Sequence, residues 1–199
     1  SILEEILAPN LYVENAQIKA GSQERVEFAV KLPGSGEDFV YLPIDAKFPA
    51  EAYAALQDAY ERADAEAADA ARKSLATFLK NSAMQIRNKY VNPPYTTDFA
   101  VMFLPFEGLY AEAVNMGMME YCQKECRVML AGPSTMAALL NSLQMGFKTL
   151  AIQKRSGEVW KVLSEVKKEF DSFALVLDKT QLRLNQASSE LDTLIGTRT

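Results

Sequence analysis

The chain of 199 residues is 49% hydrophobic, which is enough to bury the core of one domain. It contains no histidine, so Ser-His-Asp and Cys-His nucleophile systems and HExxH metalloproteases are excluded. The formal net charge of −5 argues against a broad surface that coats nucleic acid, but it permits a local basic strip.

Cysteine content and hydropathy indicate the cellular setting. Cys122 and Cys126 are too few for a disulfide framework or a zinc site, so we expect reduced residues in a cytoplasmic protein. No stretch approaches the roughly 20 apolar residues that span a membrane, so we expect no membrane contact by this segment. The uncapped apolar run that begins at Ser1 is typical of a piece of a longer protein.

The first half of the chain predicts a helix end, a hairpin and a long helical region. Residues 1–8 are typical of the end of a helix. Residues 25–32 and 39–48 predict two strands, and the turn-rich segment between them indicates an antiparallel hairpin. Residues 49–90 contain no glycine or internal proline, which favours helix with one break near the middle.

Strands and helices then alternate. Residues 98–104 and 127–131 predict buried strands, and residues 107–122 predict a helix interrupted near Gly117. A further helix opens after Gly132 and runs to about Phe147. This order predicts an α/β domain over residues 1–156, with a mixed sheet flanked by helices.

The end of the chain predicts a long coiled-coil-type helix over residues 157–199. Apolar residues recur there at alternating spacings of four and three, at Val159, Leu163, Val166, Phe170, Phe173, Leu177, Thr180, Leu184, Ala187, Leu191 and Leu194, with only Thr180 polar. We expect this helix to pack partly on the domain and partly to project toward a partner helix, so a homo-oligomer is possible.

The predicted hairpin carries the chemistry. Asp45 and Lys47 are two residues apart on a strand, so their side chains leave the same face. A register centred on the turn places Glu27 across from Asp45 on that face. Two carboxylates this close favour a divalent cation such as Mg²⁺ or Mn²⁺ between them, and the lysine suits phosphodiester hydrolysis. The alternative from these residues alone is a half-exposed salt bridge.

These residues resemble the core of the RmuC family of bacterial DNA recombination proteins. The similarity runs from about Leu3 to Leu184 and includes RVEFAV at 25–30, LPG at 32–34, IDAKFP at 44–49, KY at 89–90, PPYTTDFA at 93–100, FLPFEGLY at 103–110, AGPST at 131–135, LNSLQMGF at 140–147 and AIQKRS at 151–156.

The resemblance implies a PD-(D/E)xK, restriction-endonuclease-like fold. It implies Glu27 as the first acid, where the family often has Asp, then Asp45 as the second acid and Lys47 as the lysine. A further acid of such nucleases would fall in a Trp-Gly-Glu stretch before Ser1. The resemblance also implies a longer parent, in many members with an N-terminal hydrophobic anchor or coiled coil.

Secondary sites complete the expectations. Ser134 or Thr135 caps a helix whose free N–H groups suit a DNA phosphate, or the helix is an ordinary capped one. Glu107 is either a further catalytic acid or a residue that favours its own helix dipole. A basic strip with Lys148, Lys154 and Arg155 is a candidate DNA contact or a solvated helix face; its other members are Lys161, Lys167 and Lys168.

Two functions remain open at this point. The first is a Mg²⁺-dependent endo- or exodeoxyribonuclease acting in recombination or genome maintenance. The second is a catalytically silent DNA-structure-binding or scaffold protein that acts through the basic strip and the coiled coil. They differ in whether Glu27, Asp45 and Lys47 converge at one site that solvent can reach.

Overall fold

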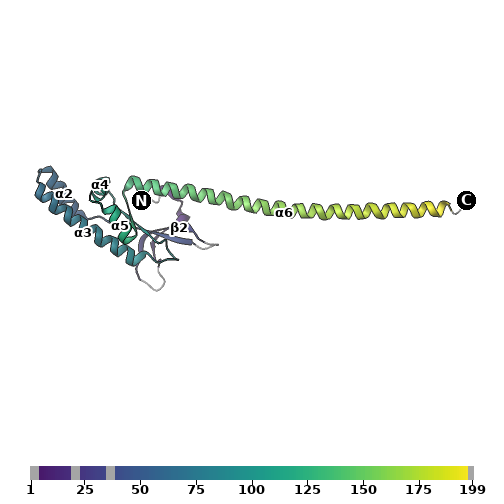
Figure 1. The fold of residues 1–199 in the computed structure, drawn as a ribbon, viewed down its shortest axis with the longest axis horizontal. Coiled ribbons are helices and arrows are strands. Elements are labelled where there is room, and N and C mark those ends of the chain that lie inside the picture. The colour runs from purple at the N-terminus through teal and green to yellow at the C-terminus, as the bar shows by residue number, and fades with distance from the viewer. Residues whose placement is uncertain (1–4, 19–22, 35–38, 197–199) are drawn as a thin grey trace. The chain divides into compact units, whose positions relative to one another are not determined.

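A computed structural model describes residues 5–18, 23–34 and 39–196 of the chain (Figure 1). Beyond residue 150, it describes the side chains of 161–173, 175–176 and 179–183. The chain divides into two compact units, Ser1–Gln144 and Met145–Thr199. The sheet and most of the helices belong to the first unit. No helix in the described ranges is long and apolar enough to cross a membrane.

The elements follow the alternation that the sequence predicts. They are η1 (Pro9–Leu11), β1 (Tyr12–Ala16), β2 (Val26–Pro33), β3 (Phe39–Ala46), α2 (Ala50–Glu61), α3 (Ala65–Tyr90), β4 (Ala100–Phe103), α4 (Glu107–Asn115), α5 (Met118–Cys126), β5 (Val128–Ala131) and α6 (Pro133–Gly196).

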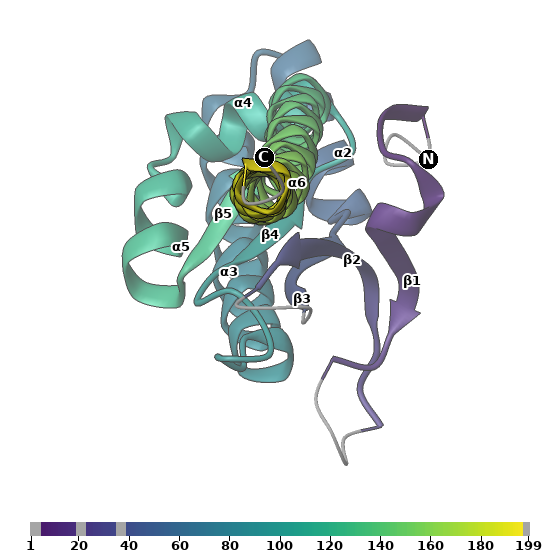
Figure 2. The ribbon, with the colours of Figure 1, turned by 90° about the vertical axis from the view of Figure 1, so that its right-hand side faces the viewer.

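The five strands form one mixed sheet in the order β1-β2-β3-β4-β5. The pairs β1–β2 and β2–β3 are antiparallel, and β3–β4 and β4–β5 are parallel. Parallel neighbours require crossovers, which α2–α3 and α4–α5 supply. Figure 2 shows β1 at one side of the sheet and β5, with α5, at the other. The predicted α/β class and mixed sheet are confirmed.

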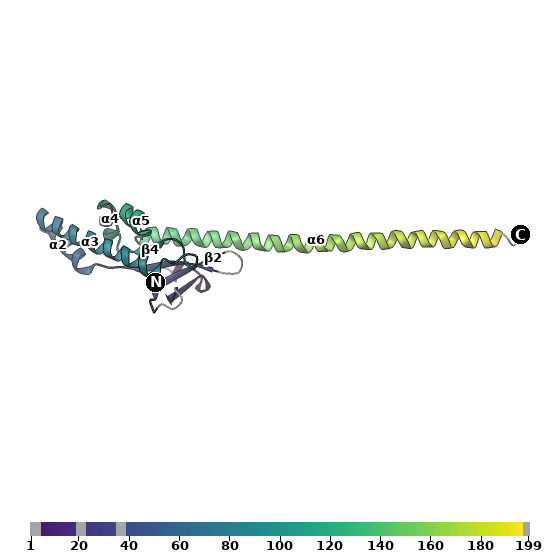
Figure 3. The same ribbon diagram turned by 60° about the horizontal axis from the view of Figure 1, so that its bottom comes forward.

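The helical region after β3 folds into a hairpin of α2 and α3, whose helices lie side by side in Figure 3. The break falls at residues 62–64, where Ala63 has a φ of 53°. Asp64 then caps α3, because its carboxylate accepts a hydrogen bond of 3.0 Å from the backbone N–H of Ala67. The predicted break therefore coincides with a local cap.

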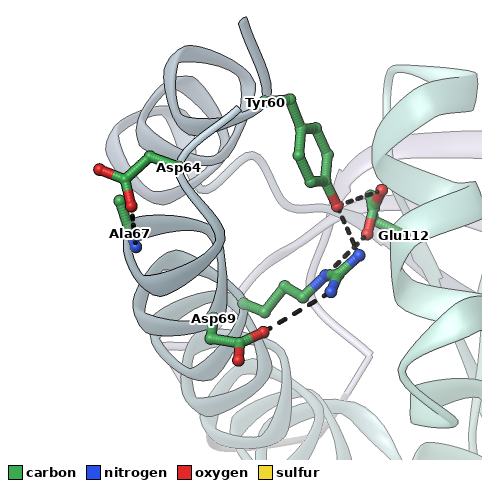
Figure 4. A network of polar contacts seen from close by, with 6 residues as sticks. Tyr60, Asp64, Ala67, Asp69 and Glu112 are labelled. Carbon is green, nitrogen blue, oxygen red and sulfur yellow. Dashed lines mark hydrogen bonds and ion pairs between the residues drawn. The ribbon is translucent and has the colours of Figure 1, made fainter. Parts of the chain in front are cut away.

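A polar network connects the α2–α3 hairpin to α4 (Figure 4). The Tyr60 hydroxyl donates a hydrogen bond of 2.9 Å to the Glu112 carboxylate and accepts one of 2.8 Å from Arg72. The other Glu112 oxygen lies 3.7 Å from Arg72 Nε. Because Tyr60, Arg72 and Glu112 come from three different helices, their contacts hold those helices in one arrangement.

The main hydrophobic core lies between the helices and one face of the sheet. Ala100, Met102 and Leu104, at alternating positions around β4, belong to this core together with Leu75 and Leu79 of α3. The strand register pairs Asp45 with Met102, so Asp45 shares the face that the core helices cover. This places the candidate catalytic acid at the margin of the core.

The structure differs from the sequence-based expectations in two elements. Strand β1 was not predicted, because its five residues, with Glu14 and Asn15, lack a strong apolar alternation. Helix α6 does not end near Phe147 but continues to Gly196. Neither Gly146 nor Gly157 stops it, because a helical glycine costs only about 1 kcal/mol and no proline follows Pro133 within the helix.

Candidate active site

The register of the β2–β3 hairpin brings the two predicted acids together. Phe28 pairs with Ile44, and the next position along each strand is Glu27 and Asp45. This is the register that the sequence predicts. Side chains opposite each other on antiparallel strands have Cβ atoms about 4.5–5.5 Å apart, so both carboxylates lie within reach of one small ligand.

Asp45 is the buried member of the pair. Only 5% of the residue is exposed, and its Oδ2 forms a close ion pair with Lys47 Nζ. The Lys47 side chain is 30% exposed. In the described part of the chain Asp45 Oδ2 has no further hydrogen-bond partner, so one of its two lone pairs stays open.

Glu27 and Lys47 are each anchored through the backbone. The Glu27 Oε2 accepts a hydrogen bond of 3.1 Å from the backbone N–H of Ala46, which directs its carboxylate to the end of β3. The backbone N–H of Lys47 donates a hydrogen bond of 2.9 Å to the Phe103 carbonyl at the end of β4. The three predicted residues therefore gather where β3 ends.

Tyr90 is a fourth group near the acids, and the sequence analysis did not select it. Burial raises the pKa of its phenol, and the negative charges of Asp45, Glu24 and Glu27 raise that pKa further. Glu24 also forms an ion pair of 3.1 Å with Lys89, the residue before Tyr90. The end of α3 thus lies against this acidic group. The only feature of the sequence that marks Tyr90 is its place at the end of α3, after the basic residues Arg87 and Lys89.

The geometry fits a hydrated divalent cation. Mg²⁺ takes one or two carboxylates and keeps several waters, which matches the pair Glu27 and Asp45 better than a cage of protein ligands. Asp45 Oδ2 pairs with Lys47 and has one lone pair left for a further ligand. Within the described residues no group of three or more acids, cysteines or histidines gathers to form a fuller metal site.

Glu107, the candidate further acid, contacts the start of α6. Its Oε1 accepts a hydrogen bond of 2.5 Å from the backbone N–H of Ser134, at the start of α6. Hydrogen bonds from the Ser134 side chain and backbone lower the pKa of Glu107. Glu107 thus joins α4 to α6, at the edge of the sheet where the parallel strands end.

The start of α6 is capped within the protein itself. The helix begins at Pro133, so Gly132 is the N-cap residue, and the expectation of Ser134 or Thr135 in that role is wrong. Thr135 Oγ1 accepts a hydrogen bond of 2.8 Å from the N–H of Gly132. Since Glu107 already holds the Ser134 N–H, a phosphate at this helix end would have to displace a carboxylate.

The predicted basic strip lies on α6 and is described only in part. Lys148 is exposed, as are the neighbouring cations Lys161, Lys167 and Lys168. The side chains of Lys154 and Arg155 fall outside the described residues. The contact of this strip with DNA stays a prediction.

The comparisons with known proteins agree on one family. A model described as the RmuC family matches residues 1–199. Two relatives named DNA recombination protein RmuC homolog, from Xylella fastidiosa strains Temecula1 / ATCC 700964 and 9a5c, are each 48% identical over 194 residues. The aligned region covers 96% of this chain and 42% of each relative, so the chain spans less than half of their length. No solved structure matches it.

Proposed function

The chain belongs to the RmuC family, and from this premise we propose that it carries the nuclease core of a DNA recombination protein. In this proposal it hydrolyses DNA phosphodiesters with Mg²⁺ or Mn²⁺ at Glu27, Asp45 and Lys47. The observation that carries the proposal is the convergence of buried Asp45, its ion-pair partner Lys47, and Glu27 across the hairpin at the end of β3. The mixed sheet is compatible with the restriction-endonuclease-like fold that the resemblance implies.

Each residue has a distinct role. Asp45 and Glu27 would hold the cation, which supplies Lewis acidity toward a phosphate oxygen when it is bound. Lys47 Nζ positions the attacking water and offsets the negative charge that develops on the phosphate. Glu107 has no direct role in this proposal, because its carboxylate accepts a hydrogen bond from Ser134.

The decisive test is cleavage of linear, nicked and branched DNA with Mg²⁺ or Mn²⁺ by this chain and its Lys47→Ala variant. We expect Lys47→Ala to reduce the cleavage rate by about a hundredfold or more, because a positioned proton-transfer or charge-stabilising group contributes that much. A chain extended upstream is tested beside it, since the resemblance implies a further acid before Ser1.

Lys31→Ala is the matched control. Lys31 lies on the same hairpin but faces Phe39 at the opposite end, where its Nζ is 5.9 Å from the ring centroid. Its loss should leave cleavage unchanged. If the extended chain binds DNA and cuts no substrate, the catalytic proposal is wrong.

That outcome would favour a second function, a DNA-structure-binding or scaffold protein. The exposed lysines of α6 support it, because cations on one helix can contact successive phosphates. This function predicts strongly salt-dependent binding that charge reversal at Lys148 and Lys161 weakens. Substitution of Asp45 would leave such binding intact.

A further inference from the structure

Two half-exposed phenyl rings lie beside the candidate site. Phe48 follows Lys47 directly, and Phe106 precedes Glu107, so each ring lies just beyond the end of a parallel strand. Phe48 is 47% exposed and Phe106 is 49% exposed, and their ring centroids are 5.0 Å apart at an interplanar angle of 51°. Phe48 follows β3 and Phe106 follows β4, two neighbouring parallel strands that Figure 2 labels.

A third ring, that of Tyr53, contacts Phe106. Tyr53, in the first turn of α2, stacks on Phe106 with centroids 6.4 Å apart and planes 19° apart. Tyr53 is partly buried and packs against the hydrophobic core. Its hydroxyl also lies against Gly108, where an added Cβ would approach it to 2.4 Å. Phe106 therefore packs against a partly buried ring, while about half of its own surface remains exposed to solvent.

We propose that Phe48 and Phe106 form a stacking platform for an unpaired nucleobase, and that the site therefore takes single-stranded or frayed DNA. This inference rests on the proposed nuclease function and names the substrate class of that same site. Aromatic rings bind bases of any sequence through their flat faces. A base in the interior of a duplex already has both faces stacked, so an unpaired base is the one that can insert its flat face against the rings.

The position of the charges supports a nucleotide rather than another apolar ligand. Lys47 directly precedes Phe48, its side chain is 30% exposed, and its ammonium, which pairs with Asp45, is the cation that suits the phosphate attached to the stacked base. Scattered exposed apolar residues are ordinary on protein surfaces. Two contacting rings flanked by a candidate catalytic lysine and by Glu107 are a more specific arrangement.

The test measures binding of a short single-stranded oligonucleotide in Ca²⁺, with an abasic site placed at each position in turn. In the wild-type chain we expect one abasic position to weaken binding by about tenfold, within the range for loss of one base stack. Phe48→Leu and Phe106→Leu should bind the intact strand about tenfold more weakly and respond little to that abasic site. Blunt duplex should bind equally to all variants.

Phe39→Leu is the matched control, because Phe39 is 57% exposed at the opposite end of β3. Phe106→Tyr keeps the ring and should keep the abasic response, which separates stacking from a loss of folding. If both leucine variants discriminate the abasic strand as the wild type does, the platform is wrong even where Lys47→Ala abolishes cleavage. If no variant cleaves DNA but the abasic response behaves as expected, the platform stands and the nuclease proposal fails.

Discussion

At the scale of single residues, Asp45 differs most from an ordinary surface acid. The salt bridge that the sequence left open as the alternative is present, because Asp45 pairs with Lys47. Asp45 is 5% exposed, and only Lys47 of the pair reaches the solvent. Burial of a carboxylate costs free energy, which the ion pair with Lys47 partly offsets.

Tyr90 offers a test of the cation site that does not depend on cleavage. The negative charges of Asp45, Glu24 and Glu27 add to burial in raising the pKa of Tyr90, so Mg²⁺ bound between the acids should lower that pKa. Asp45→Asn should lower it too and should remove the response to Mg²⁺. The measurement is ultraviolet titration of phenolate, with the curve of Tyr90→Phe subtracted. A titration that Mg²⁺ leaves unchanged would exclude a cation beside these acids.

Glu107 makes stability depend on pH. Its pKa is lower in the folded protein than the ordinary value of 4.5, because Ser134 stabilises the charged form. The stabilisation is therefore present above the unfolded pKa and is lost as pH falls through the lower folded value. Glu107→Gln should lower Tm near neutral pH, and the difference from wild type should shrink as acid is added. A difference that is constant across acidic pH would show that the carboxylate charge contributes nothing.

At the scale of elements, short local signals decide where helices stop. Gly117 separates α4 from α5 with a φ of 71°, a left-handed conformation that glycine adopts without strain. Asp64 and Gly132 directly precede two further helices, α3 and α6. The Asp64 carboxylate accepts a hydrogen bond from the Ala67 N–H, and Thr135 Oγ1 accepts one from the Gly132 N–H. Because these signals involve neighbours in sequence, the boundaries around α4 and α5 were predictable.

Gly117→Ala should lower the free energy of unfolding by about 1–2 kcal/mol, because an L-residue is strained in the left-handed region. An added Cβ would meet nothing within 4 Å, so the effect is purely one of backbone conformation. Urea unfolding measures it. Gly146→Ala is the matched control, since that helical glycine also has open space and alanine there should raise helicity. Equal destabilisation by both variants would contradict this explanation.

At the scale of the whole molecule, the described part of the unit Met145–Thr199 is helical to Gly196 and carries exposed apolar residues. Phe170 is 68% exposed and Phe173 is 60% exposed, and Leu163 and Val166 continue the same spacing. Such a stripe is typical of a helix with a partner. The homo-oligomer predicted from the heptads remains a proposal.

We expect the chain to self-associate and the double variant Phe170→Glu and Phe173→Glu to weaken association by at least about tenfold. The reason is that each buried Phe contributes about 1.5–3 kcal/mol. Sedimentation velocity over a range of protein concentrations measures this. Asp171→Asn, which changes a charge away from the stripe, should leave the assembly unchanged. A wild-type chain that stays monomeric at every concentration would refute the expectation.

The sequence by itself determined the hairpin of the candidate site and most local elements, but not β1 or the length of α6. The register of Glu27 against Asp45 followed from the turn, because a two-residue side-chain period and a short loop leave few alternatives. The breaks between helices followed as well, because residues close together in the sequence, such as Asp64 and Gly117, encode them.

Only the tertiary structure decided which groups from distant segments meet. The pairing of Glu107 with Ser134, the approach of Tyr90 to the acids and the contact of Phe48 with Phe106 each join parts of the chain far apart in sequence. No local pattern encodes such contacts, because they depend on the order of β3, β4 and β5 in the sheet and on how the crossover helices pack. The burial of Asp45 belongs here as well, since the packing of the helices over the sheet determines how much water reaches the end of β3.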